Sequence, residues 1–314
     1  MKLNIKKLLA LLIVSLLVLV GCGSNGGDTP SGENGDEKYL IYLITMDQMD
    51  QHWVNLSKGA EAAANELGNV EFKWVAPDVK DDAKQIEAIN NAISAGADAI
   101  LLAANGPDAV TSALQEAQAE GIKILYVDSP ANFPAEQTLA TDNKAAGKTA
   151  GEELIAALTA KGVTEGDIGI ISTNPSTDST NNRIAGFLEA FEGTGYTVLE
   201  PQYRDGDPVR SQDAAQNFLT SGVVGLFGAN EGSTVGVGNA IAAESSEVIA
   251  VGFDYSDNIK ELLLDGTLLA SMVQNPEVMG SEGIKSAVKI LKGETLDVEV
   301  FDTGVTVTTK ENAQ

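Results

Sequence analysis

The sequence predicts an α/β protein made of two lobes, each built on a doubly wound parallel sheet. Short apolar runs alternate along the chain with longer segments of helical periodicity, the pattern of parallel strands joined by crossover helices. Runs such as Ala99-Ile100-Leu101-Leu102 are apolar without interruption, as expected for strands that are buried on both faces. The part of the chain after residue 37, about 277 residues, is also longer than one compact core usually supports, which favours two lobes.

Each expected element follows from one of these runs or periodic segments. Strands are expected at 39–45, 70–75, 99–103 and 122–127 in the first half, and at 168–172, 197–200, 223–227, 248–252 and 268–273 in the second. Helices are expected between them at 53–67, 82–95, 108–119, 144–158, 180–191, 211–219 and 233–243.

The N-terminus has the features of a bacterial lipoprotein signal. Residues 1–21 combine a basic head with an apolar run at 8–20, which is shorter than the roughly 20 residues of a membrane span. The run ends in Leu19-Val20-Gly21-Cys22, which resembles a lipobox, and Cys22 is the only cysteine of the chain. The sequence therefore predicts a lipid on Cys22, an extracytoplasmic protein anchored to the bacterial cell membrane, and no intrachain disulfide. Residues 22–37, rich in Gly, Ser, Asn and acidic residues, predict a flexible tether.

The composition excludes some classes of partner. The formal net charge is −25, and nucleic acids are bound largely through cationic contacts to phosphate, so no nucleic-acid partner is expected. The same surplus of negative charge disfavours an anionic ligand. The chain has only three arginines that could form a local basic pocket, Arg183, Arg204 and Arg210. His52 is the only histidine, so no metal site of histidine type and no cofactor are predicted.

Polar residues gather where the predicted strands end, at 45–48, 105–108, 128–130, 230–232 and 252–254. In open α/β sheets, ligands bind outside the carboxyl ends of the strands. Two such sheets facing each other would form a cleft from their combined strand ends, and we expect the binding site there.

Several of these segments together resemble the ribose- and galactose-type periplasmic binding proteins, which deliver sugars to ABC importers. No single segment is specific, but their order and spacing are, and they extend over essentially the whole mature domain. The segments are Asp50-Gln51-His52-Trp53, Ala99-Ile100-Leu101-Leu102 followed by Asn105, Ile124-Leu125-Tyr126-Val127-Asp128, Ala140-Thr141-Asp142-Asn143, Gly225-Leu226-Phe227-Gly228-Ala229-Asn230, Val251-Gly252-Phe253-Asp254 and Leu269-Ala270-Ser271-Met272-Val273-Gln274-Asn275-Pro276.

The resemblance implies the type I periplasmic-binding-protein fold, with two lobes joined by a three-segment hinge. It places the crossings near 142–143, 274–276 and 301–303. The expected N-terminal lobe is then 38–142 plus 276–301, and the expected C-terminal lobe is 143–275 plus 302–314.

The resemblance also implies ligand contacts, residue by residue. Trp53 falls where an aromatic ring stacks on the sugar. The other expected ligand-binding residues are Asp50, Asn105, Asp128, Asp142, Arg183, Asn230, Asp254 and Gln274. Asp accepts hydrogen bonds while Asn and Gln both donate and accept, so such a set can satisfy the hydroxyls of a sugar. Ser129 and Asn181 stand where the family usually has arginines, which leaves ribose itself open as the ligand.

The expected function is therefore capture of a monosaccharide or related polyol and its delivery, by a monomeric protein, to an ABC permease and its ATPase. Alternatives within the same fold are an autoinducer-2 or rhamnose-type receptor, or a ligand sensor for a chemoreceptor or kinase. A glycoside hydrolase would use paired carboxylates such as Asp128 and Asp254, but the chain has no nucleophile elbow and is not expected to be an enzyme. A sugar-responsive repressor would need an N-terminal DNA-binding segment, where the signal peptide stands instead.

Overall fold

The computed structural model describes residues 38–313. The predicted signal peptide at 1–21, the tether at 22–37 and the lipid site at Cys22 lie outside the described residues. Every helix among residues 38–313 is too short or too polar to span a bilayer.

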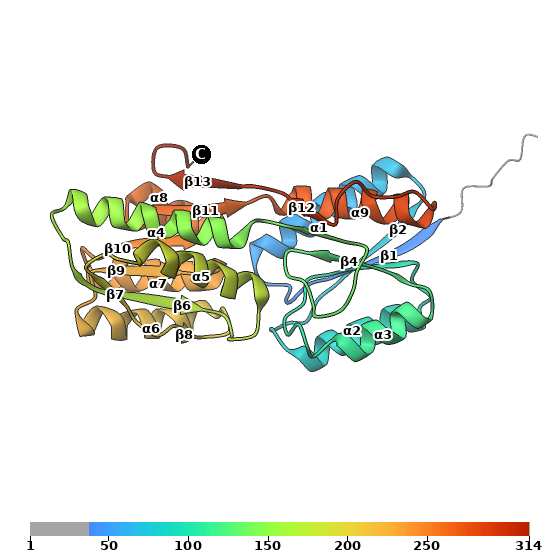
Figure 1. Ribbon diagram of the computed structural model, residues 1–314, viewed down its shortest axis with the longest axis horizontal. Helices are drawn as coiled ribbons and strands as arrows, with labels where there is room; N and C mark the ends of the chain where they lie inside the picture. Colours follow the sequence, from blue (N-terminus) through green and yellow to red (C-terminus); the bar gives the residue numbers. More distant parts are fainter. Residues whose placement is uncertain (1–37, 314) are drawn as a thin grey trace, which may run out of the picture. The chain divides into compact units, whose positions relative to one another are not determined.

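Strands and helices alternate along most of the described chain (Figure 1). The strands are β1 (Tyr39–Ile44), β2 (Val70–Val75), β3 (Ala99–Leu102), β4 (Lys123–Val127), β5 (Gln137–Ala140), β6 (Gly166–Ser172), β7 (Tyr196–Val198), β8 (Gln202–Tyr203), β9 (Gly225–Gly228), β10 (Ile249–Phe253), β11 (Ala270–Gln274), β12 (Val300–Asp302) and β13 (Val305–Thr309). The helices are α1 (Gln51–Leu67), α2 (Asp82–Ser94), α3 (Thr111–Ala119), α4 (Asn143–Ala160), α5 (Asp178–Phe191), α6 (Pro208–Ser221), α7 (Glu231–Glu244), α8 (Asp257–Asp265) and α9 (Pro276–Leu291).

The strands form two separate sheets, one in each lobe. The first sheet has the order β12-β5-β4-β3-β1-β2, and the second has the order β13-β11-β10-β9-β6-β7, with β8 paired to β6. All pairs are parallel except β11 with β13, which is antiparallel. The predicted fold class, α/β with two parallel-sheet lobes, is confirmed.

The chain passes between the two sheets three times. It leaves the first sheet after β5, and the next helix, α4, packs against β10 and β11 of the second sheet. It returns after β11, and the next helix, α9, packs against α1 and β4 of the first lobe. It passes back once more between β12 and β13, which belong to different sheets.

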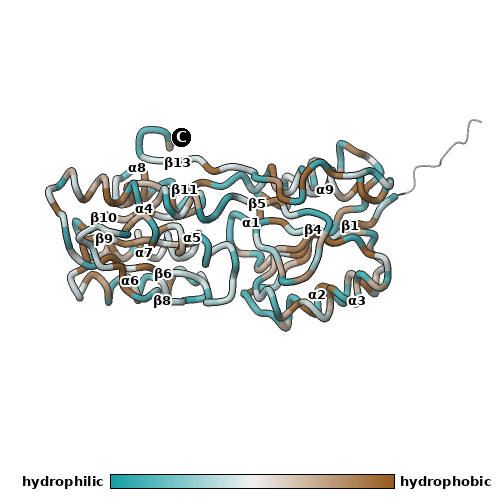
Figure 2. The backbone as a smooth tube through the Cα atoms, viewed as in Figure 1, coloured by the Kyte–Doolittle hydropathy of each residue, from teal (hydrophilic) through white to brown (hydrophobic). Residues whose placement is uncertain are grey.

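Helices cover both faces of each sheet, and the cores lie between helices and strands. Along β1, Ile41 and Leu43 pack under α1 and α9, while Tyr42 and Ile44 pack under α2 and α3. This alternation explains why the strands are apolar on both faces. Figure 2 shows the result as hydrophobic strands inside each lobe, with hydrophilic residues concentrated in the loops and on the outer helix faces.

Helix α1 is fixed against α9 by two glycines. A Cβ atom on Gly59 would lie 2.1 Å from the carbonyl oxygen of Glu277, and one on Gly280 would lie 2.0 Å from that of Leu56. The two backbones are therefore in direct contact, which sets the position of the N-terminus of α1 near the junction of the lobes.

The elements that the sequence did not predict are β5, β8, β12, β13, α8 and α9. The four strands have at most five residues each, too few to establish a period of two. Helix α9 has Pro276 in its first turn, a favourable position for proline. The sequence did not predict this helix, because residues 274–276 are assigned to a crossing between the lobes.

Candidate functional site

Two aspartates from corresponding positions in the two lobes frame the candidate site. Asp128 follows β4 and Asp254 follows β10, and both have a left-handed backbone, with φ of 63° and 71°. Few residues other than glycine adopt this conformation, although aspartate tolerates it better than most. Both carboxylates are buried and line one small cavity of about 30 Å³ between the lobes.

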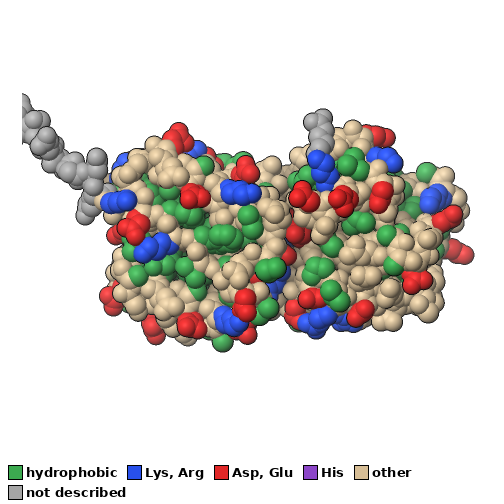
Figure 3. Space-filling view, turned by 180° about the vertical axis from the view of Figure 1, so that it is seen from behind, with side chains coloured by type: hydrophobic (Ala, Val, Ile, Leu, Met, Phe, Trp, Pro, Cys, Tyr) green, Lys and Arg blue, Asp and Glu red, His purple; other side chains and the backbone are tan. Residues whose placement is uncertain are grey.

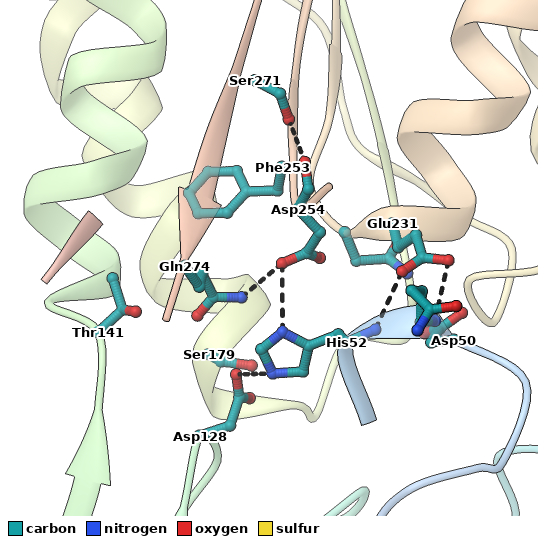
Figure 4. Close-up of polar contacts among 12 residues, drawn as sticks. Asp50, His52, Asp128, Thr141, Ser179, Glu231, Phe253, Asp254, Ser271 and Gln274 are labelled. Atoms are coloured by element: carbon teal, nitrogen blue, oxygen red, sulfur yellow. Dashed lines mark hydrogen bonds and ion pairs between the residues drawn. The ribbon is translucent and has the colours of Figure 1, made fainter. Parts of the chain in front are cut away.

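His52 lies between these two carboxylates. Its Nε2 atom is 3.1 Å from Asp128 Oδ2, and its Nδ1 atom is 3.5 Å from Asp254 Oδ1 (Figure 4). Burial alone lowers the pKa of His52, but the contact with Asp128 and the negative charge of Asp254 outweigh it, so the pKa is raised. The same contact with His52, helped by Arg183, overcomes burial at Asp128 and lowers the pKa of that carboxyl to about 2.

Arg183 approaches Asp128 from the second lobe. Its guanidinium is held by Asn143 Oδ1 at 2.8 Å and by the carbonyl oxygen of Ala229 at 2.9 Å, and it stacks on the ring of Phe253. The distance from its NH2 atom to Asp128 Oδ2 is 3.8 Å. Arg183 is thus a buried, firmly positioned cation that lines the same cavity.

A second charged group stands at the start of α1. Lys80 Nζ lies 2.8 Å from a carboxylate oxygen of Asp47 and 2.8 Å from one of Asp50. Burial lowers the pKa of Lys80, but the two carboxylates more than reverse this and raise it. The two carboxyl groups differ in the direction of their pKa shifts. Burial raises the pKa of Asp50, and Lys80 only partly opposes this. At Asp47, burial also acts to raise the pKa, but Lys80 and two backbone N–H groups outweigh it and lower the pKa.

Gln274 and Asn230 supply amide groups to the cavity. Gln274 Nε2 donates to Asp254 Oδ1 at 2.7 Å, whereas Gln274 Oε1 has no hydrogen-bond partner. Asn230 caps α7 by accepting from the N–H of Ser233, and its Nδ2 atom has no acceptor. Unpartnered buried amide groups are costly, which is expected at a site built to bind a polar molecule.

Glu231 connects the lobes through backbone groups of α1. Its Oε1 accepts from the N–H of Gln51 at 3.1 Å, and its Oε2 accepts from the N–H of His52 at 3.2 Å (Figure 4). Burial and the nearby charges of Asp50 and Asp254 raise the pKa of Glu231 to about 8, although the two N–H groups oppose this.

The stability of the protein is therefore expected to fall as the pH rises from 4.5 to about 8. The unfolded chain releases the proton of Glu231 near its ordinary pKa of 4.5, whereas the folded chain holds it until about 8. The raised pKa values of Asp50 and His52 act in the same direction. Urea titrations should give a lower free energy of unfolding at pH 9 than at pH 5. Glu231→Gln should reduce that difference by on the order of 3–5 kcal/mol.

The control for that experiment is Glu244→Gln, an exposed position at the end of the same helix. It should leave the slope as in the parent protein. Equal slopes for the parent protein and Glu231→Gln would contradict the assignment of this proton to Glu231.

The structure brings together seven of the residues expected from the sequence and leaves two apart. Residues that line the cavity are Asp50, Trp53, Asp128, Arg183, Asn230, Asp254 and Gln274. Asn105 does not line it; its carbonyl oxygen accepts from Thr177 Oγ1 at 2.9 Å, which links the lobes beside the cavity. Asp142 is exposed and caps α4 by accepting from the N–H of Ala145 at 3.0 Å.

Trp53 is largely a core residue. Only 4% of it is exposed, it belongs to the cluster under α1 and α9, and its ring meets that of His52 edge-on at 4.7 Å. His52 is therefore the ring that lies between the carboxylates, and it is not among the ligand-binding residues expected from the sequence. Its place beside Trp53, at the end of a polar loop, was the available signal.

Other residues that sequence reasoning missed come from the second lobe and from the loop before α2. Thr173, Thr177, Ser179, Thr180 and Lys80 line the cavity, and Glu231 lies next to it. The face of the molecule in Figure 3 shows no histidine, in keeping with the burial of His52, while charged side chains of both signs border the junction of the lobes.

Comparisons with known proteins agree with this architecture. Residues 41–295 match the periplasmic binding protein domain. The chain is 30% identical to the ribose import binding protein of Haemophilus influenzae, over 94% of this chain and 97% of that protein. It is 28% identical to the ribose import binding protein of Escherichia coli, over 94% of this chain and 96% of that protein.

Solved structures show the same similarity. An ABC transporter solute-binding protein from Agrobacterium vitis with bound D-fucose has a TM-score of 0.83 and 31% identity, covering 87% of this chain and 96% of that one. A carbohydrate transporter solute-binding protein from Agrobacterium radiobacter in complex with D-arabinose also has a TM-score of 0.83 and 31% identity, covering 88% and 95%.

These proteins are binding components of transport systems, so the prediction that the chain is not an enzyme is confirmed. The resemblance found in the sequence is confirmed as well, since the match extends over most of the chain. The chain belongs to the periplasmic binding protein domain family.

Proposed function

We propose that this protein binds a monosaccharide or related polyol between its lobes and delivers it to an ABC permease driven by a cytoplasmic ATPase. One observation carries the proposal: polar side chains from the strand ends of both lobes line a single buried cavity. Carboxylates, amides and hydroxyls in such a set match the donors and acceptors of sugar hydroxyls. Relatives named for ribose and for D-allose, and structures holding D-fucose and D-arabinose, support a sugar ligand.

The proposed mechanism is closure of the lobes on the ligand. Asp128 lies in the first lobe and Asp254 in the second, so a ligand bound by both favours the closed form over the open one. The proposed lobe boundaries are 38–142 plus 276–301 and 143–275 plus 302–314, with the three crossings as the hinge. We also propose that the protein acts as a monomer, after removal of residues 1–21 and attachment of a lipid to Cys22.

A thermal-shift screen of the purified protein tests the ligand class. The panel contains D-ribose, D-allose, D-galactose, D-fucose, D-arabinose, L-rhamnose, common polyols and autoinducer-2. A ligand present at 100 times its dissociation constant should stabilise the folded state by about 2.7 kcal/mol, and calorimetry should show saturable heat without product formation. A shift with autoinducer-2 alone would favour a signalling receptor, whereas no shift with any member, or cleavage of a glycoside, would contradict the proposal.

A further inference from the structure

Asp254 is the carboxylate of the cavity whose charge is least compensated. Among the residues that the structure describes, its one ion pair is with His52, at 3.5 Å between Oδ1 and Nδ1. The other direct contact of its carboxylate is the neutral amide of Gln274, at 2.7 Å. Asp254 therefore relies on a titratable side chain from the opposite lobe for its counter-charge.

The two permanent cations near the cavity, Lys80 and Arg183, form ion pairs with carboxylates other than Asp254. Lys80 lies 2.8 Å from both Asp47 and Asp50. Arg183 is 3.8 Å from Asp128 and is otherwise bonded to neutral acceptors. In and beside the cavity, aspartates outnumber these cations, since Asp47, Asp50, Asp128 and Asp254 lie together there.

A ligand that contacts both lobes would take the place of the contact between His52 and Asp254. The cavity of about 30 Å³ is far smaller than the roughly 300–1,000 Å³ of pockets that hold small molecules, so a sugar ring needs the lobes to move apart around the imidazole. His52 and Asp128 belong to the first lobe, and they lie 3.1 Å apart. A ring that enters between the lobes keeps that pair together and separates His52 from Asp254, which is then a buried carboxylate without a counter-charge.

A second group of the same cavity also calls for a donor. Gln274 Oε1 has no hydrogen-bond partner, although only 4% of Gln274 is exposed, and the Nε2 atom of the same side chain is fixed on Asp254. Two acceptors thus lie on neighbouring side chains. A protonated amine supplies three N–H donors and one positive charge, whereas a hydroxyl supplies a single donor and no charge.

We propose that the ligand carries a protonated amino group that pairs with Asp254, so that it is an amino sugar or a related amino polyol. This inference rests on the proposed binding of a sugar-like molecule between the lobes. The remaining hydroxyls of such a ligand face Asp128, the free Nδ2 of Asn230 and the hydroxyl of Ser179, which all line the cavity.

Calorimetry on matched sugars tests the inference. The probes are D-glucose, D-galactose and D-mannose, each with its 2-amino-2-deoxy form and its N-acetylated form, at pH 7. At least one amine should bind 10-fold or more tightly than its neutral parent and its N-acetyl derivative. Asp254→Asn should remove that preference while neutral sugars lose less, and Asp257→Asn, an exposed position at the start of α8, should keep it.

Two outcomes would overturn the inference, and they are distinguishable. If a neutral sugar, from these series or from the wider panel, binds as tightly as every amine tested, the requirement for an amino group is refuted. The proposed function then stays in place. Failure of all neutral and amino sugars to bind would refute the proposed function together with the inference.

Discussion

Replacing Asp128 with alanine is expected to lower the affinity for the sugar ligand by about 100-fold or more, since a buried carboxylate that lines the cavity and can accept charged hydrogen bonds from the ligand is lost. The same change leaves the buried guanidinium of Arg183 and the buried imidazole of His52 without the carboxylate that both contact. Removing one partner from a buried ion pair costs about 3–5 kcal/mol, so the free energy of unfolding should fall as well. Calorimetry with the ligand found in the panel measures the first effect, and urea unfolding measures the second.

Two further variants separate charge from shape and from general damage. Asp128→Asn keeps the size of the side chain and should retain more stability than Asp128→Ala, while still losing affinity. Glu136→Ala removes an exposed carboxylate from the same lobe, where its pair with Lys123 is solvated, and should change neither quantity appreciably. Unchanged affinity in a folded Asp128→Ala protein would place the ligand elsewhere.

Trp53→Ala is expected to lower the free energy of unfolding by about 3–5 kcal/mol, the usual cost of removing a large aromatic side chain from a core. Trp53 is almost fully buried and packs with Leu56 and Met279 in the cluster under α1 and α9. Trp53→Phe should lose much less, because it keeps most of the apolar volume. Urea unfolding of the two variants gives the comparison.

The control is Trp74→Ala, which removes a partly buried indole at the edge of the same sheet. It should cost less than Trp53→Ala. A Trp53→Ala protein of parental stability that had lost sugar binding would show that the indole serves the ligand, as the sequence predicted, rather than the core.

The sequence predicts the sheet-forming strands and their polar ends well, because burial on both faces leaves an uninterrupted apolar run. Asp128 and Asp254 were found for the same reason: each directly follows such a run. Lys80 could not be found, because it reaches the site from the loop before α2 and not from a predicted strand end. Glu231 stands within the polar segment at 230–232, but nothing in that segment indicates that its carboxyl group accepts from backbone N–H groups of α1. Their neighbours, Asp50 and the N–H groups of α1, are defined only by the tertiary packing.

Asp142 shows the opposite difficulty. It stands at the end of a strand in the same way as Asp128, yet it caps α4 and is exposed to solvent. Both roles suit an aspartate that follows a strand, since its carboxylate accepts hydrogen bonds readily in turns and caps. Only the direction in which the chain leaves the sheet separates the two, and the sequence does not contain that direction in any local pattern.

The return of the chain to its first sheet has a kinetic consequence. Strand β12 at Val300–Asp302 pairs with β5 at Gln137–Ala140, and α9 covers α1 from more than two hundred positions away. Such pairings close very long loops, which slows folding. During synthesis the N-terminal lobe remains unfinished, with an open sheet edge and an uncovered face, until almost the last residue has emerged. A chain of this topology thus stays incompletely folded for as long as it is being made, which suits a polypeptide that must be threaded across a membrane before it folds.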